Sequence, residues 1–273
     1  MSMLNEILNA LQYTFVIRAL LVGSLIALSA AFLGVYLVIL RQSMIGDGLA
    51  HVSFLTIAIA LLLNQSTILV SLPIVIAASI GIMHLDEQYE INNDSAIGLI
   101  SSVAVALAIL ITSVGSGFSV DLYSYLFGSI LVINDIDMYL SIALAISVVF
   151  LIVINYNSLL IMAFDQEYAQ VIGINVKAMK YLIATLTAIT VVLGIRVVGT
   201  MLISAMILFP TISAMQISKN FKEVIKYASI ISIISIIIGV FGSYFLDIPT
   251  GSTIVLVNAI AFIGFLIRKQ AYV

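Results

Sequence analysis

Cysteine and tryptophan are both absent from this chain of 273 residues, and charged residues make up only 8% of it. Without cysteine the chain forms no disulfide bond and no thiolate metal site. Soluble domains carry about 25% charged residues, whereas 63% of this chain is hydrophobic. A soluble fold of this length has too small an interior for so many apolar side chains, so part of the surface must face lipid. The net charge of −3 and the lack of a long basic run argue against nucleic acid as a partner.

Long apolar runs account for most of the sequence. A transmembrane helix needs about 20 consecutive apolar residues. Nine stretches approach this length, at about 13–40, 47–64, 66–84, 95–116, 137–156, 177–195, 199–217, 226–246 and 252–268. The stretch 119–133 is too short and too interrupted to span, and we expect a helix at the membrane surface there. The sequence predicts an all-α polytopic integral membrane protein with eight or nine transmembrane helices in one domain, 1–273, the count depending on the first stretch.

Polar loops at 85–94, 164–175 and 218–223 indicate how these helices are oriented. Lysine and arginine collect on the cytoplasmic side of membrane proteins. Alternating spans place eight of the ten basic residues on the side of the 164–175 loop, namely Arg41, Lys177, Lys180, Lys219, Lys222, Lys226, Arg268 and Lys269. The two exceptions are Arg18 and Arg196, and we expect Arg196 to extend to the outer interface. The prediction is an outside N-terminus and an inside C-terminus.

The segment RQSMIGDGLAHVS, residues 41–53, contains the strongest candidate for a metal site. Asp47 and His51 are four residues apart and share one face if the segment is helical. A carboxylate oxygen and an imidazole nitrogen both suit zinc, manganese or iron, and ionisable residues inside a membrane domain are costly and usually functional. Two simpler interpretations remain open. Asp47 caps a helix between Gly46 and Gly48, or His51 makes an ordinary interhelical hydrogen bond.

Other ionisable residues have simpler interpretations. His84, the second of two histidines, lies beside Asp86 and Glu87 and is expected at the cytoplasmic boundary. Asp121 and Asp135 flank the 119–133 stretch, and we interpret them as solvated loop charges.

The loop 164–175 (FDQEYAQVIGIN) is a polar island between two spans. Its pattern predicts a short cytoplasmic helix that ends at a glycine. A short helix held between two spans is a natural docking element for a partner, and an ordinary amphipathic connector has the same pattern. The residues predicted to form this element are Asp165, Glu167, Tyr168, Ala169 and Gly173.

Motifs of enzymatic activity are missing. The sequence contains no phosphate-binding G-x-x-x-x-G-K-[ST] and no zinc-protease H-E-x-x-H. Gly46 and Asp47 match half of the G-x-G-D motif of intramembrane aspartyl proteases, but Met44 stands in the first glycine position. We therefore expect a transport subunit, and if transport uses ATP, a separate subunit must hydrolyse it.

Five blocks of sequence, taken in order, resemble one family. They are RQSMIGDGLAHVSF (41–54), YLFGSIL (125–131), FDQEYAQVIGIN (164–175), VVGTMLISAMILFPTISA (197–214) and DIPTGSTIVL (247–256). Together they make the chain, over about 15–268, similar to the permease subunits of the ATP-binding-cassette importers for zinc and manganese. The H-V-S that begins at His51 is closer to the zinc members.

The resemblance implies a homodimer of this chain in the bacterial plasma membrane, two cytoplasmic ATPase subunits and an extracellular metal-binding protein. It implies that 164–175 is the coupling helix that docks on the ATPase. It further implies that Asp47 and His51 lie in the translocation pathway near mid-membrane, with an unwound break over Ser43–Gly48. The divalent metal is then cargo, no cofactor is bound permanently, and ATP binds the partner subunit.

Three alternatives remain open. In the first, the cargo is manganese or iron in place of zinc. In the second, the chain is a proton-coupled secondary metal transporter, although such proteins usually bury more acidic residues in their spans. In the third, the chain is an intramembrane enzyme, which would need a second catalytic group beside Asp47, and the sequence offers no convincing one.

Overall fold

The computed structural model describes residues 9–89, 91–114, 128, 135–200 and 202–270. In this part of the chain every element is a helix, as the all-α prediction requires. The helices are α2 (Thr14–Ile39), α3 (Ile45–Leu62), α4 (Thr67–Tyr89), α5 (Asn93–Val114), α7 (Asp135–Ile154), α8 (Tyr156–Phe164), α9 (Gln166–Val171), α10 (Val176–Val198), α11 (Ile203–Ile217), α12 (Phe221–Leu246) and α13 (Thr250–Gln270). The predicted surface helix at 119–133 lies outside the described residues, apart from Gly128.

Within the described residues, eight helices are long and apolar enough to cross a membrane, and α11 is a shorter apolar helix. The prediction of eight or nine spanning helices is confirmed. The count was expected to depend on the first stretch, but that stretch forms the continuous helix α2 of 26 residues. The short one is α11, whose 15 residues cover roughly 22 Å at the α-helical rise, less than the hydrocarbon core of a bilayer.

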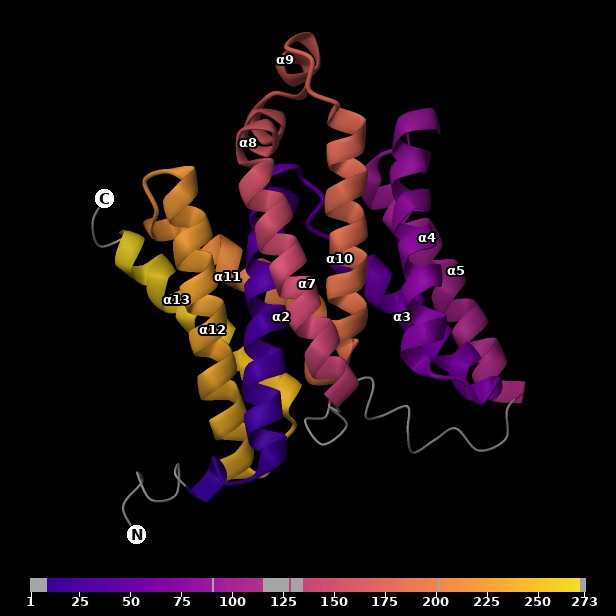
Figure 1. Ribbon diagram of the computed structural model, residues 1–273, viewed down its shortest axis with the longest axis vertical. Helices are drawn as coiled ribbons and strands as arrows, with labels where there is room; N and C mark the ends of the chain where they lie inside the picture. Colours follow the sequence, from indigo (N-terminus) through magenta and orange to yellow (C-terminus); the bar gives the residue numbers. More distant parts are fainter. Residues whose placement is uncertain (1–8, 90, 115–127, 129–134, 201, 271–273) are drawn as a thin grey trace.

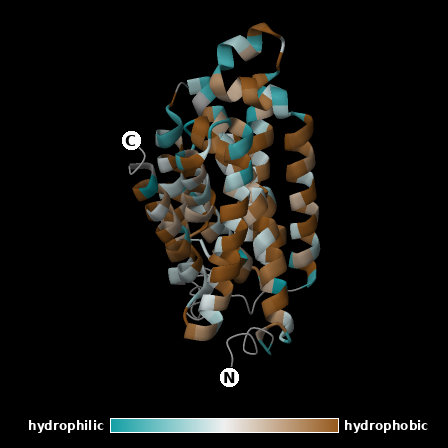
Figure 2. Cartoon of the chain, turned by 90° about the vertical axis from the view of Figure 1, so that its left-hand side faces the viewer, coloured by the Kyte–Doolittle hydropathy of each residue, from teal (hydrophilic) through white to brown (hydrophobic). Residues whose placement is uncertain are grey.

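The long helices run between two ends of the molecule, and α9 lies beyond the others at one end, with α8 just below it (Figure 1). The three polar loops approach one another there. Lys177 Nζ lies 3.0 Å from Glu87 Oε2, and the ring centroids of Phe164 and Phe221 are 6.2 Å apart. Hydrophilic residues gather around α9, while hydrophobic residues dominate the long helices (Figure 2). Following the predicted orientation, we call the α9 end the inner end and the opposite end, where α2 begins, the outer end.

The interior of the bundle is formed mainly by α2, α3 and α10. In the most apolar windows of these helices 61% to 72% of the residues are buried, against 22% to 33% in the other five long helices. The outward faces of those five carry large exposed apolar side chains, such as Leu107 on α5 and Phe150 on α7. This distribution is the one expected for a bundle whose outer helices face lipid.

Arg18 and Arg196, the two exceptions to the positive-inside pattern, both form ion pairs with the first turn of α7. Arg18 Nη2 lies 2.6 Å from Asp135 Oδ1, and Arg196 Nη1 lies 2.5 Å from both carboxylate oxygens of Asp137. The expectation that Arg196 extends to the interface is therefore wrong, because its side chain is only 12% exposed. The outer end tolerates these two arginines because two carboxylates neutralise them.

Gly128 lies against the outer end of α10 and has a left-handed backbone, with φ of +73°. A Cβ atom added there would lie 2.5 Å from the Val198 carbonyl carbon, 2.6 Å from the Val197 oxygen and 2.8 Å from the Gly199 nitrogen. All three neighbours are backbone atoms, so no side-chain rotation relieves the contact. Only glycine fits this position.

We expect Gly128→Ala to lower the free energy of unfolding by more than about 1 kcal/mol, because alanine is strained at positive φ and here also meets backbone. Thermal unfolding of the purified protein in detergent measures the effect. Gly98→Ala on α5 is the matched control, since an added Cβ meets nothing within 4 Å there. Equal unfolding midpoints for the two variants would contradict the prediction and would show that the backbone at the outer end of α10 shifts to accommodate the added methyl group.

Candidate functional site

The turn between α2 and α3 places the candidate metal-binding residues. Helix α2 ends at Ile39, and the chain turns through residues 40–44 before α3 begins at Ile45. Gln42 is buried in this turn, and its side-chain amide donates to the Met83 sulfur at 3.7 Å. The unwound break implied for Ser43–Gly48 is therefore shorter than expected, because the residues from Ile45 onward are helical.

Asp47 and His51 lie on one face of α3, as their spacing predicted. The Asp47 Oδ2 and His51 Nε2 atoms are 3.5 Å apart, and the two side chains are 40% and 38% exposed. Asp47 is the third residue of α3, and the N-cap is Met44, which makes no side-chain capping hydrogen bond. The interpretation of Asp47 as a helix cap is therefore wrong.

The two residues belong to a stripe along α3 that the rest of the chain leaves open. We call the positions Met44, Asp47, His51, Leu55 and Leu62 the open stripe; they recur every three, four or seven residues and are at least partly exposed. Most positions between them, such as Ala50 and Val52, are buried, while Phe54, Ile59 and Leu61 are partly exposed. One face of α3 thus packs into the bundle, while the face that carries both ionisable side chains points away from it.

Ser204, near the start of α11, lies beside the Asp47 carboxylate. Its hydroxyl oxygen is buried and makes no hydrogen bond of standard geometry with any described residue. Gly46 allows this approach, because a Cβ atom added there would lie only 3.0 Å from Ile207 Cδ1 and 3.6 Å from Ser204 Oγ. The sequence reasoning missed Ser204, since a single serine in an apolar run carries no periodic signal.

The geometry of the pair suits two ligands of one divalent ion. Two ligands about 2.05 Å from a tetrahedral zinc ion are about 3.4 Å apart, close to the observed 3.5 Å between Asp47 and His51. The part of the chain that the structure describes contains no group of three or more His, Cys, Asp or Glu residues placed to hold a metal. A single chain would therefore offer two ligands of this kind at this position, and a closed site would need others.

The polar island, residues 164–175, contains one short helix, as predicted, and α8 precedes it. Helix α8 continues to Phe164, and Asp165 then caps α9, its carboxylate accepting from the Tyr168 N–H at 2.8 Å. Gly173 has a φ of +89°, and the Ile174 N–H donates to the Ala169 carbonyl at 2.9 Å. This is the left-handed exit predicted for Gly173.

The surface of α9 differs from the expected one at Ala169. That side chain is fully buried against the rest of the chain, so it cannot belong to a docking surface. The large apolar side chains exposed around α9 are Phe164, Tyr168, Val171 and Ile172. Glu167 is also exposed. We call these five residues the α9 surface. Tyr168 and Val171 were expected to form its apolar part, whereas Phe164 and Ile172 were not among the predicted residues.

Comparisons with known proteins agree with this architecture. The family model for the ABC 3 transport family matches residues 12–269. The chain is 31% identical over 261 residues, covering 95% of this chain and 93% of the other, to the manganese transport system membrane protein MntC of Listeria monocytogenes. It is 29% identical over 260 residues, covering 95% and 99%, to the high-affinity zinc uptake system membrane protein ZnuB of Haemophilus influenzae. The solved structure of PsaBC from Streptococcus pneumoniae in complex with Fab contains a similar chain, with a TM-score of 0.85, 29% identity and coverage of 96% and 95%.

These relatives are transport subunits without catalytic activity of their own. The chain therefore belongs to the ABC 3 transport family, as a multi-pass permease subunit of a metal-ion transporter in the bacterial cell membrane.

Proposed function

We propose that this permease imports zinc, and that the ion passes between Asp47 and His51 of two copies of the chain. The observation that carries the proposal is the open stripe of α3, in which a carboxylate and an imidazole face out of a single chain at the separation expected for two ligands of one ion. An ionisable side chain of a spanning helix is costly when it faces lipid, by up to about 3 kcal/mol at the centre of the membrane. That cost favours a second protein surface over the stripe, and a second copy of the chain brings an equivalent pair.

Zinc is favoured by the ligand set that two copies would supply. Two aspartates and two histidines give two oxygen and two nitrogen donors, a set that suits a tetrahedral zinc ion. A transit site must also release its ion, and two ligands from each side are easily separated when the copies move. The H-V-S that begins at His51 supports the same choice.

Manganese is the second candidate, because the named function of the Listeria monocytogenes relative is manganese transport. Manganese prefers more oxygen ligands than zinc does, and the Ser204 hydroxyl beside Asp47 is the additional oxygen that the structure offers.

Energy for import would enter through the α9 surface. The chain has no phosphate-binding loop, and membership of an ABC family favours a separate ATPase over a proton gradient. Exposed apolar side chains beyond the ends of the spanning helices are typical of a protein interface. We therefore infer that α9 docks on a cytoplasmic ATPase subunit, and that an extracellular metal-binding protein delivers the ion at the outer end.

Uptake of radioactive zinc and manganese into the same vesicles tests the cargo. Vesicles contain the permease with its ATPase and receive loaded metal-binding protein on the outer side. We expect ATP-dependent zinc uptake to be at least about tenfold faster than manganese uptake. A set of two nitrogen and two oxygen ligands disfavours manganese, which prefers octahedral coordination by oxygen. Vesicles with a non-hydrolysable ATP analogue are the control. If manganese uptake is faster than zinc uptake, the cargo is manganese. If metal uptake is as fast with the analogue as with ATP, the ATP-driven mechanism is contradicted.

A further inference from the structure

The ion pair between Arg196 and Asp137 joins three helices at the outer end. Arg196 lies in the last turn of α10, and its Nη1 atom contacts both carboxylate oxygens of Asp137, in the first turn of α7, at 2.5 Å. Its Nη2 atom donates to the Thr67 hydroxyl, at the start of α4, at 3.2 Å. The Asp137 side chain is 3% exposed and the Arg196 side chain 12%. A carboxylate at the start of α7 and a guanidinium at the end of α10 also complement the two helix dipoles.

Helices α7 and α10 are the two long helices that flank α9 in the sequence, and both run from the inner end to the outer end (Figure 1). The chain joins them at the inner end through α8 and α9. The Asp137–Arg196 pair joins them again at the outer end. The result is a closed frame, with α9 at one end and a buried ion pair at the other.

Helix α10 is also tied to α4 along its length. Lys177 pairs with Glu87 at the inner end, and the Ser79 hydroxyl donates to the Ala184 carbonyl at 2.8 Å between the two ends. The Arg196–Thr67 contact completes the series at the outer end. Antiparallel helices joined at both ends and between them move as one body more readily than they slide.

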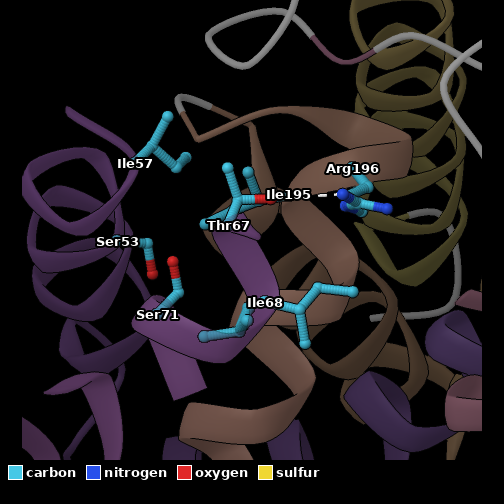
Figure 3. Close-up of a pocket in the computed structure, with 8 residues that line it drawn as sticks. Ser53, Ile57, Thr67, Ile68, Ser71, Ile195 and Arg196 are labelled. Carbon is cyan, nitrogen blue, oxygen red and sulfur yellow. Dashed lines mark hydrogen bonds between the residues drawn. The ribbon is translucent and has the colours of Figure 1, made fainter. Parts of the chain in front are cut away.

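Polar contacts continue from α4 to the helix that carries the metal-binding pair. The Thr56 hydroxyl of α3 donates to the Ser71 hydroxyl of α4 at 2.7 Å. Ser53, Ser71, Thr67 and Arg196 line a cavity of about 10 Å³ between α3, α4 and α10 (Figure 3), roughly the space that one water molecule needs. Ser53 is two residues from His51 and lies on the buried side of α3. The contacts therefore lead from the frame to the helix that carries the open stripe.

We propose that the Asp137–Arg196 pair is a positioning latch, which holds α7 and α10 in one register so that displacement of α9 reaches the outer half of the pathway. The inference rests on the proposed docking of α9 on an ATPase. A buried ion pair adds little stability over well-packed apolar side chains. It is directional, however: one guanidinium nitrogen of Arg196 contacts both Asp137 oxygens and the other reaches Thr67, so the pair fixes the relative positions of three helices as apolar contacts do not. The latch therefore sets how motion is transmitted more than how firmly the bundle holds together.

The experiment measures metal ions imported per ATP hydrolysed, in vesicles that contain permease and ATPase. Asp137→Asn should lower this ratio about tenfold, within the range found for residues that couple distant sites, while ATPase binding and hydrolysis persist. Asp135→Asn is the matched control, because it breaks the exposed Arg18–Asp135 pair in the same turn of α7. It should leave the ratio unchanged.

The double variant Asp137→Leu, Arg196→Met guards against a folding defect, since it leaves no unpaired buried charge. It should fold with a near-normal unfolding temperature and yet show the lowered ratio. A normal ratio in the double variant would overturn the latch, and so would an equal loss in Asp135→Asn. Absence of ATP-driven uptake by the unsubstituted protein would instead refute the proposed function, so the two failures are distinguishable.

Discussion

Replacing either Asp47 or His51 with alanine should abolish metal uptake while the protein remains folded. The two side chains offer the ligand pair at the open stripe, 3.5 Å apart. Loss of outer-shell partners already lowers metal affinity or activity about 10- to 100-fold, so loss of a direct ligand should lower uptake by at least about 100-fold. Asp47→Asn should lose metal uptake as well, because it preserves the size of the side chain but removes the anionic oxygen that a divalent ion requires.

Stability measurements separate this role from a structural one. A partly exposed pair four residues apart on a helix contributes at most about 0.5 kcal/mol, so the unfolding temperatures of these variants should hardly change. His84→Ala is the control, since it removes the other histidine of the chain, an exposed one at the inner end of α4. Uptake should remain normal in this variant. Continued uptake by the Asp47→Ala, His51→Ala double variant would show that the ion takes another route.

The number and class of the helices could be predicted because lipid leaves an apolar chain few choices. A run of about 20 apolar residues in a bilayer must satisfy its backbone groups internally, and in an apolar chain that means a helix. The spacing of Asp47 and His51 predicted their shared face for a similarly local reason. The start of α3 was less predictable, because Gly46 and Gly48 resemble a break in the sequence but pack as parts of the helix against α11 and α5.

Contacts between distant segments left no trace in the sequence. Arg196 and Asp137 are 59 residues apart, so neither residue carries a local sign of the other, and a single arginine at the end of a span suggests exposure to the interface. Ala169 presents the same difficulty on a smaller scale. A helix of six residues is too short for a pattern of buried and exposed positions to show that its alanine faces inward.

The α9 surface leads to the second large expected effect, the loss of ATPase binding in Val171→Arg. Val171 is 83% exposed at the inner end, in the last helical position of α9. An arginine there suits the end of a helix electrostatically, so α9 itself should remain intact. If Val171 inserts into an apolar cleft of the ATPase, the charge would be desolvated without a partner. Central interface residues of this kind are worth about 2 kcal/mol or more, so binding should weaken at least about 30-fold.

Val171→Arg is a sharper test of docking than a substitution at Ala169. Because Ala169 is fully buried, Ala169→Arg would displace α9 from its own chain and would lower binding whether or not α9 touches a partner. Gln88→Arg, which adds the same charge at an exposed position on α4, is the control for a general effect of charge at the inner end. Co-purification with the ATPase and metal uptake are measured together on all three variants. Docking through α9 requires that Val171→Arg lose both while Gln88→Arg keeps both. If Val171→Arg binds the ATPase normally, the exposed apolar side chains around α9 need another explanation and the ATPase must engage a different inner loop.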